Sequence, residues 1–118
     1  MDGKNKLIKE RTYEFALRII KLSRQIPQSR EGSVLGRQVL RSGTSVGANV
    51  EEATSAFSKE DFTYKMSTSL KEARETQYWL KLVRDSGLLP PNRMESIIKE
   101  AEEIKNILGA IVRTSKRI

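Results

Sequence analysis

The amino-acid sequence predicts an all-α protein, an antiparallel up-down-up-down four-helix bundle. Apolar residues recur at helical spacing along most of the chain, and the strict polar/apolar alternation that marks strands is missing. The three prolines, at 27, 90 and 91, stand only where the periodic segments end. Four helices joined by short loops favour sequential neighbours that reverse direction, and 118 residues favour a single domain over residues 1–118.

The first two helices are expected over residues 5–25 and from about residue 34 to residue 57. Pro27 ends the first helix, and the polar loop Q-S-R-E-G separates it from the second. The apolar face of the first helix is Ile8, Phe15, Ile19, Leu22 and Ile26. The apolar stripe of the second is Val34, Leu35, Val39, Val46, Val50, Ala53 and Phe57.

Capping signals place the last two helices. Ser58 is the expected N-cap of the third helix, with Asp61 in the first turn, and Gly87 suits the left-handed residue after its end, with Leu88 closing the cap. After Pro90-Pro91, Asn92 and Glu95 are expected to form a second capping pair. The inward residues of the two helices are Phe62, Met66, Ala73, Leu80 and Val83, then Met94, Ile97, Ala101, Ile104, Leu108 and Ile111.

The stretch R-S-G-T-S-V-G-A-N-V-E-E-A, residues 41–53, combines weak helix formers with a position inside the second helix. Each Gly costs about 1 kcal/mol relative to Ala there, so the stretch needs a packing or functional reason. Gly36, Gly43 and Gly47 fall on one edge of the helix, which predicts close approach of a neighbouring backbone.

The same stretch carries a family resemblance, together with F-S-K-E-D-F and K-E-A-R-E-T-Q-Y-W-L further on. These segments resemble the four-helix-bundle proteins encoded in intervening sequences of bacterial large-subunit (23S) rRNA genes. The family pattern S-(I/V)-(G/P)-x-N-(I/V)-x-E is matched from Ser45 to Glu52, and E-x-x-E-T by Glu72, Glu75 and Thr76. The family is similar in fold to a ring-shaped pentameric accessory protein of diversity-generating retroelements, which binds nucleic acid and a reverse transcriptase. The resemblance therefore implies a ring-like homo-oligomer without an established catalytic activity.

The polar residues of the matched segments are expected to form a structural cluster. Its members are Arg41, Ser45, Asn49, Glu52, Glu72, Glu75 and Thr76. Glutamates on facing helices also suggest a di-iron site, but such sites use His, and the sequence has none. Pairing of these glutamates with Arg or Lys is favoured over a hard cation, so no metal is predicted.

Composition narrows the function further. The sequence lacks Cys and His, which removes thiolate nucleophiles, the commonest general base and the commonest metal ligand. No Gly-rich phosphate loop accompanies the carboxylates, so neither an enzyme nor a cofactor is predicted. The start has no apolar signal region, and no apolar run is long enough to span a membrane, which favours a soluble cytoplasmic protein.

A second apolar stripe lies opposite the expected core on the first and third helices. Its members are Tyr13, Leu17 and Ile20, then Tyr64, Tyr78 and Leu82. Contiguous exposed apolar residues usually mark an interaction surface, and the simplest partner is another copy of the chain. The alternatives are coverage by loops and stacking of the tyrosines on unpaired RNA bases.

The net charge is +7 with a pI near 9.9, and residues 1–30 alone contribute +5. Such basicity favours polyanionic partners. Lys4, Arg11 and Arg18 form a basic stripe on the first helix, and Arg113, Lys116 and Arg117 lie near the C-terminus. These six are the predicted nucleic-acid-binding residues, and the N-terminal lysines and the C-terminal tail are expected to form one basic patch. The leading hypothesis is a non-enzymatic homo-oligomer, pentameric by the resemblance, that presents this basic surface to RNA or another nucleic acid. The alternative is an adaptor that scaffolds a partner enzyme, with the charge serving solubility or steering.

Overall fold

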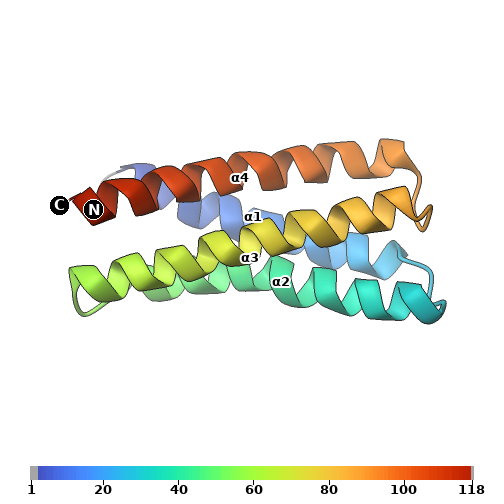
Figure 1. Ribbon diagram of the computed structural model, residues 1–118, viewed down its shortest axis with the longest axis horizontal. Coiled ribbons are helices and arrows are strands. Elements are labelled where there is room, and N and C mark those ends of the chain that lie inside the picture. Colours follow the sequence, from blue (N-terminus) through green and yellow to red (C-terminus); the bar gives the residue numbers. More distant parts are fainter. Residues whose placement is uncertain (1–2, 118) are drawn as a thin grey trace.

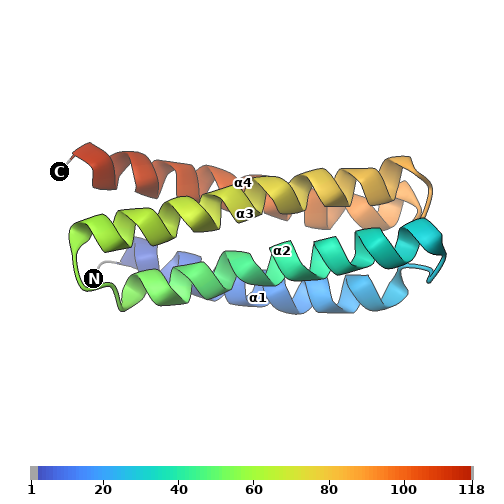
Figure 2. The same cartoon turned by 60° about the horizontal axis from the view of Figure 1, so that its bottom comes forward.

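Four helices of similar length pack side by side with successive helices running in opposite directions (Figures 1 and 2). The computed structural model describes residues 3–117, with side chains from residue 7 onward. The helices are α1 (Gly3–Gln25), α2 (Arg30–Thr54), α3 (Lys59–Asp85) and α4 (Pro91–Arg117). Each helix contacts its sequence neighbours, and α4 also closes against α1, although this last pair is the least closely packed. The predicted fold class is confirmed.

The core is built from the apolar faces that the helical spacing predicted. Ile8, Phe15 and Ile19 of α1 are almost completely buried, as are the inward residues of α3 and α4 except the half-buried Phe62. The predicted stripe of α2 is buried over Val39, Val46, Val50 and Ala53. Its two ends were predicted wrongly, because Val34 is 47% exposed and Phe57 is 98% exposed.

Local capping explains why the stripe of α2 is shorter than expected and its helix begins earlier. Ser29 is the N-cap, and its hydroxyl accepts the Gly32 N–H at 3.1 Å, so the helix starts at Arg30 inside the predicted loop. Gly32 is required there because a Cβ would lie 1.8 Å from the carbonyl oxygen of Pro27. At the other end the helix stops at Thr54, and Phe57 belongs to the loop before the next N-cap.

The ends of α3 agree with the predicted caps. The Ser58 hydroxyl accepts the Asp61 N–H at 3.0 Å, and Gly87 has φ +81°. The Leu88 N–H reaches the Val83 carbonyl at 3.1 Å, which closes a Schellman cap. The predicted Asn92 cap of α4 is wrong, because α4 begins one residue earlier. Pro91, whose fixed φ suits the first helical position, starts the helix and places Asn92 inside it.

The glycine edge of α2 faces α1, as the small residues predicted. A Cβ on Gly43 would lie 2.7 Å from two carbons of Ile19, and one on Gly47 would lie 3.1 Å from the Thr12 carbonyl oxygen. A Cβ essentially never lies as close as 2.7 Å, and 3.1 Å is tighter than an ordinary Cβ contact, so these glycines permit α1 and α2 to pack at this distance. Gly36 is looser, with its nearest neighbour, Ile26, at 4.0 Å.

Both chain ends lie at one end of the bundle, together with the α2–α3 loop (Figures 1 and 2). The opposite end carries the α1–α2 and α3–α4 loops, and we refer to it as the two-loop end. Among the described residues, none of the helices combines the length and apolarity that a membrane span requires.

Candidate nucleic-acid interface

Polar side chains connect α2 to α3 along one side of the bundle. The guanidinium of Arg41 contacts Glu72 at 3.3 Å and forms a second ion pair with Glu75. Glu75 also accepts the Trp79 indole N–H at 3.1 Å, and Gln38 accepts the Arg41 Nε–H at 3.1 Å. One arginine therefore joins two turns of α3, in the fork geometry that suits guanidinium and carboxylate groups.

Buried hydroxyl groups extend this connection into the core. The Thr76 hydroxyl lies 2.9 Å from Ser42 Oγ and 2.7 Å from the Glu72 carbonyl oxygen. Ser69 donates across the interface to the Val46 carbonyl at 2.7 Å. These bonds satisfy buried polar atoms that would otherwise destabilise the α2–α3 interface. They account for Ser42 of α2 and for Ser69 and Thr76 of α3 as structural residues.

Three other members of the predicted polar cluster take no part in the ion pairs of Arg41. Ser45 and Asn49 hydrogen-bond to carbonyl oxygens of their own helix, at 2.7 and 2.9 Å. Glu52 contacts Lys65 at 3.7 Å nearer the α2–α3 loop. The structure therefore brings Arg41, Glu72 and Glu75 together, and distributes the remaining residues along the same side.

Side chains also join α3 to α4. The Gln77 amide donates to Glu102 at 2.6 Å, and Lys105 lies 2.9 Å from the same carboxylate. Donation by the Gln77 amide, followed by that of Lys105, lowers the pKa of the Glu102 carboxyl.

The α1–α4 contact contains two of the predicted basic residues, and they have different partners. Arg11 contacts Glu100 at 2.7 Å and Glu103 at 2.9 Å, so its charge is neutralised by two carboxylates. Hydrogen bonds to Glu100, then to Glu103, raise the pKa of the Arg11 guanidinium, which stays cationic. Arg18, two turns later, donates instead to the neutral Ser96 hydroxyl at 2.8 Å.

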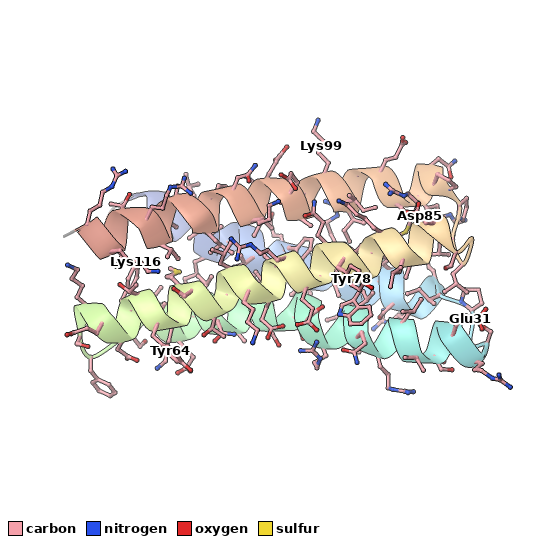
Figure 3. The ribbon with its side chains drawn as sticks, viewed as in Figure 1. Glu31, Tyr64, Tyr78, Asp85, Lys99 and Lys116 are labelled. Atoms are coloured by element: carbon pink, nitrogen blue, oxygen red, sulfur yellow. The ribbon has the colours of Figure 1, made fainter. Side chains whose placement is uncertain are left out.

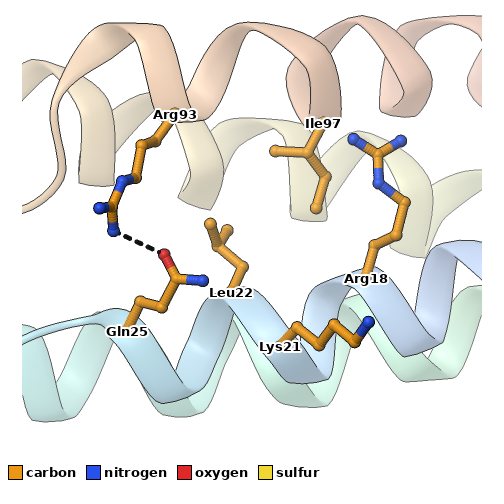
Figure 4. A pocket seen from close by; sticks show the side chains of 6 residues that line it. All are labelled: Arg18, Lys21, Leu22, Gln25, Arg93 and Ile97. Carbon is orange, nitrogen blue, oxygen red and sulfur yellow. Dashed lines mark hydrogen bonds between the residues drawn. The ribbon is translucent and has the colours of Figure 1, made fainter.

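A groove of about 390 Å³ opens between α1 and α4 beside Arg18. Leu22 and Ile97 point toward each other at its centre, between Arg18 and the pair formed by Arg93 and Gln25 (Figure 4). The Arg93 guanidinium donates to the Gln25 side-chain oxygen at 2.9 Å, and Lys21 completes the lining. We call this the α1–α4 groove. No carboxylate is among its lining residues, all of which belong to the described part of the chain.

The rest of the predicted basic patch lies at the end that holds the termini. Arg113, Lys116 and Arg117 are exposed near the end of α4, where Figure 3 shows Lys116. Lys116 also lines a cavity of about 560 Å³ with Lys59 and Tyr64 of α3. Lys4 belongs to α1, but its side chain lies outside the described residues. The other two predicted residues lie elsewhere on α1: Arg11 is paired with glutamates of α4, and Arg18 lies nearer the two-loop end.

The predicted apolar stripes are exposed on two separate helices. Tyr13 is 63% exposed and Leu17 47% exposed on α1, while Tyr64 is 70% and Tyr78 58% exposed on α3 (Figure 3). Ile20 and Leu82 are half-buried beside them. Because α1 and α3 make no contact in the described bundle, the stripes form two distinct surfaces.

Sequence reasoning missed a group of cations on α1 and α2, which we call the α1–α2 cations. Residues 15–50 contain six Lys or Arg and only one acidic residue, Glu31. Arg41 is paired as described, and the other five are exposed: Arg18, Lys21, Arg24, Arg30 and Arg37. Among the described side chains, none of these five lies within ion-pair distance of a carboxylate. A count of basic and acidic residues over this segment could have found them.

Acidic side chains do not gather in the way a metal site requires. Within residues 7–117 no three carboxylates come close enough together to hold an ion. Two pairs of neighbouring carboxylates each share an arginine: Glu72 and Glu75 contact Arg41, and Glu100 and Glu103 contact Arg11.

The fold and these surfaces define a small basic four-helix-bundle protein with exposed cationic and apolar side chains. Residues 4–110 match the family described as 23S rRNA-intervening sequence protein, and the chain belongs to that family. The resemblance drawn from the sequence is thereby confirmed.

A solved structure supports this assignment. It is a protein with unknown function from the S23 ribosomal protein family of Bacteroides thetaiotaomicron, 39% identical in sequence, with a TM-score of 0.87. The similarity covers 93% of this chain and 98% of that one. A comparison with curated proteins finds no match.

Proposed function

We propose that this protein is a non-enzymatic homo-oligomer that binds RNA through the phosphate backbone. The observation that carries the proposal is the set of five exposed α1–α2 cations, none of which has a carboxylate partner among the described side chains. Cations that are not neutralised within the protein can release the counterions of a polyanion, which is the main source of affinity for nucleic-acid backbones. The family description, with its reference to 23S rRNA, makes RNA the first polyanion to test.

The positions of two cations on their helices support a binding role. Arg30 is the first residue of α2 and Arg93 the third of α4. Positive side chains at helix N-termini oppose the helix dipole, so neither position is explained by helix stability. A bound phosphate at the two-loop end would offset both charges.

The oligomeric part of the proposal rests on the two exposed apolar stripes. Because they lie on α1 and α3, which do not touch, one copy can present its α1 stripe to the α3 stripe of the next. Such a head-to-tail contact forms a ring when the rotation closes. Leu40 of α2 is a further exposed apolar side chain, at 39%. Five subunits is the number that the retroelement resemblance implies.

An adaptor role is the alternative, and one observation favours it. Phe57 is almost completely exposed in the α2–α3 loop, beyond either stripe, which suits a contact with another protein. In both roles the protein would work in the cytoplasm, where RNA and its processing enzymes are present.

The experiment is a salt titration of RNA binding by fluorescence anisotropy. Wild-type protein should bind labelled single-stranded RNA at roughly 50 mM salt and lose affinity steeply as salt rises. Replacement of Arg24, Arg30 and Arg37 by Gln should weaken binding and flatten the slope by up to about 0.7 per lost phosphate contact. The same substitutions in Arg113, Lys116 and Arg117 measure what the C-terminal end of α4 contributes.

The matched control removes three cations from the outer face of α3, by Lys71→Gln, Arg74→Gln and Lys81→Gln. It changes the net charge equally and should have a smaller effect on affinity. Equal losses in the α1–α2 and α3 variants would show a general charge effect and contradict the assignment to α1 and α2. No binding by the wild type at low salt would reject the RNA function in favour of the adaptor.

A further inference from the structure

We infer that the α1–α4 groove is a binding site for a single-stranded RNA segment, with phosphates at its two ends and a nucleoside over its apolar centre. This inference rests on the proposed RNA function and names the place on the molecule where one strand is held. The two halves of the α1–α4 contact use similar residues on α1 and different residues on α4.

The half nearer the chain termini is neutral. There Arg11 is held by Glu100 and Glu103, and two carboxylates surround a single guanidinium. A phosphate would be repelled by these carboxylates and would have to displace a pair with contacts of 2.7 and 2.9 Å. This half closes the bundle and offers no anion site.

In the half nearer the two-loop end, hydrogen bonds position two arginine side chains without neutralising their charge. Arg18 is held by the Ser96 hydroxyl at 2.8 Å, and Arg93 by the Gln25 amide oxygen at 2.9 Å. Both partners are uncharged, so each guanidinium keeps its full charge and most of its five N–H donors. Lys21 adds a third cation to the same groove. Hydrogen bonds to neutral partners reduce the side-chain entropy lost when an anion binds, which is preorganisation.

The shape and lining of the groove specify the ligand. From Gln25 to Arg18 the groove follows about two turns of α1, roughly 10 Å at 1.5 Å per residue. Cations stand at both ends, and Leu22 and Ile97 form the floor between them (Figure 4). Proteins that bind single strands combine a positive groove along the backbone with flat side chains on which the bases stack, usually aromatic rings and also Arg guanidinium groups. Here the guanidinium groups flank the small exposed parts of Leu22 and Ile97. A volume of about 390 Å³ is in the range of small-ligand sites. A free inorganic phosphate would use the cations and leave the floor uncovered.

The test compares two double variants that change the net charge equally. Lys21→Gln with Arg93→Gln removes groove cations, and both positions are exposed. Arg74→Gln with Lys81→Gln removes two exposed cations from α3. With fluorescein-labelled single-stranded RNA at roughly 50 mM salt, the groove variant should bind about tenfold more weakly than wild type and show a slope flatter by about 1.4. The α3 variant should lose less than about threefold, and both should keep the wild-type melting temperature.

The outcomes test the groove and the proposed RNA function independently. RNA binding by the wild type with equal losses in the two double variants would overturn the groove and leave the RNA function standing. Absence of wild-type binding would overturn both. Displacement of the RNA by inorganic phosphate at constant ionic strength would assign the groove to the free anion. An equal effect of the groove variant on duplex RNA of the same sequence would refute the single-strand assignment.

Discussion

Gly36 and Gly43 provide a direct test of how α1 and α2 pack, because they occupy equivalent positions one heptad apart on α2. Alanine at either position should gain about 1 kcal/mol of helix propensity. The two sites differ in space. A Cβ at residue 36 would lie in ordinary contact, 4.0 Å from Ile26, whereas a Cβ at residue 43 would lie 2.7 Å from two carbons of Ile19.

The overlap at residue 43 cannot be relieved cheaply. Ile19 is completely buried, and the two carbons nearest the new methyl are the branch atoms next to its Cβ, which have little rotamer freedom. Overpacking of this kind costs about 1 to 3 kcal/mol. The expected result is that Gly36→Ala stabilises the protein by about 1 kcal/mol, while Gly43→Ala ranges from no change to a loss of about 2 kcal/mol.

The assay is thermal unfolding followed by circular dichroism at equal protein concentrations, because oligomers unfold in a concentration-dependent way. At roughly 4 °C per kcal/mol for a chain of this size, the two variants should differ in melting temperature by about 4 to 12 °C. Gly109→Ala on α4, where a Cβ would meet only Arg113 at 3.5 Å, is a further control that should behave like Gly36→Ala. If Gly43→Ala melts at or above the temperature of Gly36→Ala, close helix approach is not the reason for glycine at residue 43.

Two further predictions concern assembly and pH. The double variant Leu17→Glu, Tyr78→Glu changes one residue in each exposed stripe, so light scattering should show smaller particles that remain helical; assembly at wild-type size would refute the stripe-to-stripe contact. The lowered pKa of Glu102 means that its bonds to Gln77 and Lys105 add stability above the ordinary glutamate pKa near 4.3, which is lost as pH falls through the lower folded pKa. Wild type should therefore be more stable than Glu102→Gln at pH 7, and a difference in melting temperature that persisted at about pH 2 would contradict this linkage.

The sequence predicted the fold well because helical spacing and capping chemistry are local. Ser58 could be assigned as an N-cap because its hydroxyl needs only a free N–H of the first helical turn. Gly87 could be assigned because the end of a helix commonly requires a left-handed residue. Errors occurred at the starts of α2 and α4. Ser29 lies inside a segment that reads as a loop, and its role depends on Gly32 fitting against Pro27, a contact that no local pattern reveals.

The candidate site was harder to predict, because charge alone does not indicate a partner. Arg41 and its glutamates lie on adjacent helices and were correctly expected to be near one another. Spacing along α1 placed Arg11 and Arg18 on one basic stripe, but it could not show that their partners on α4 differ. The acid-poor segment from residue 15 to residue 50 can be counted in the sequence, but only the folded helices show which of its cations are paired.

The different roles of Arg11 and Arg18 follow from the antiparallel register of α1 and α4. As α1 advances from Arg11 to Arg18, the facing residues of α4 recede from Glu103 and Glu100 to Ser96 and Arg93. The charge of α4 therefore changes from acidic to basic along the contact, while α1 presents arginine at both levels. One level neutralises its arginine and holds the bundle closed, and the other keeps its positive charge available for a ligand. Because this register depends on the tertiary fold, the function of each arginine can be assigned only after the two helices are placed side by side.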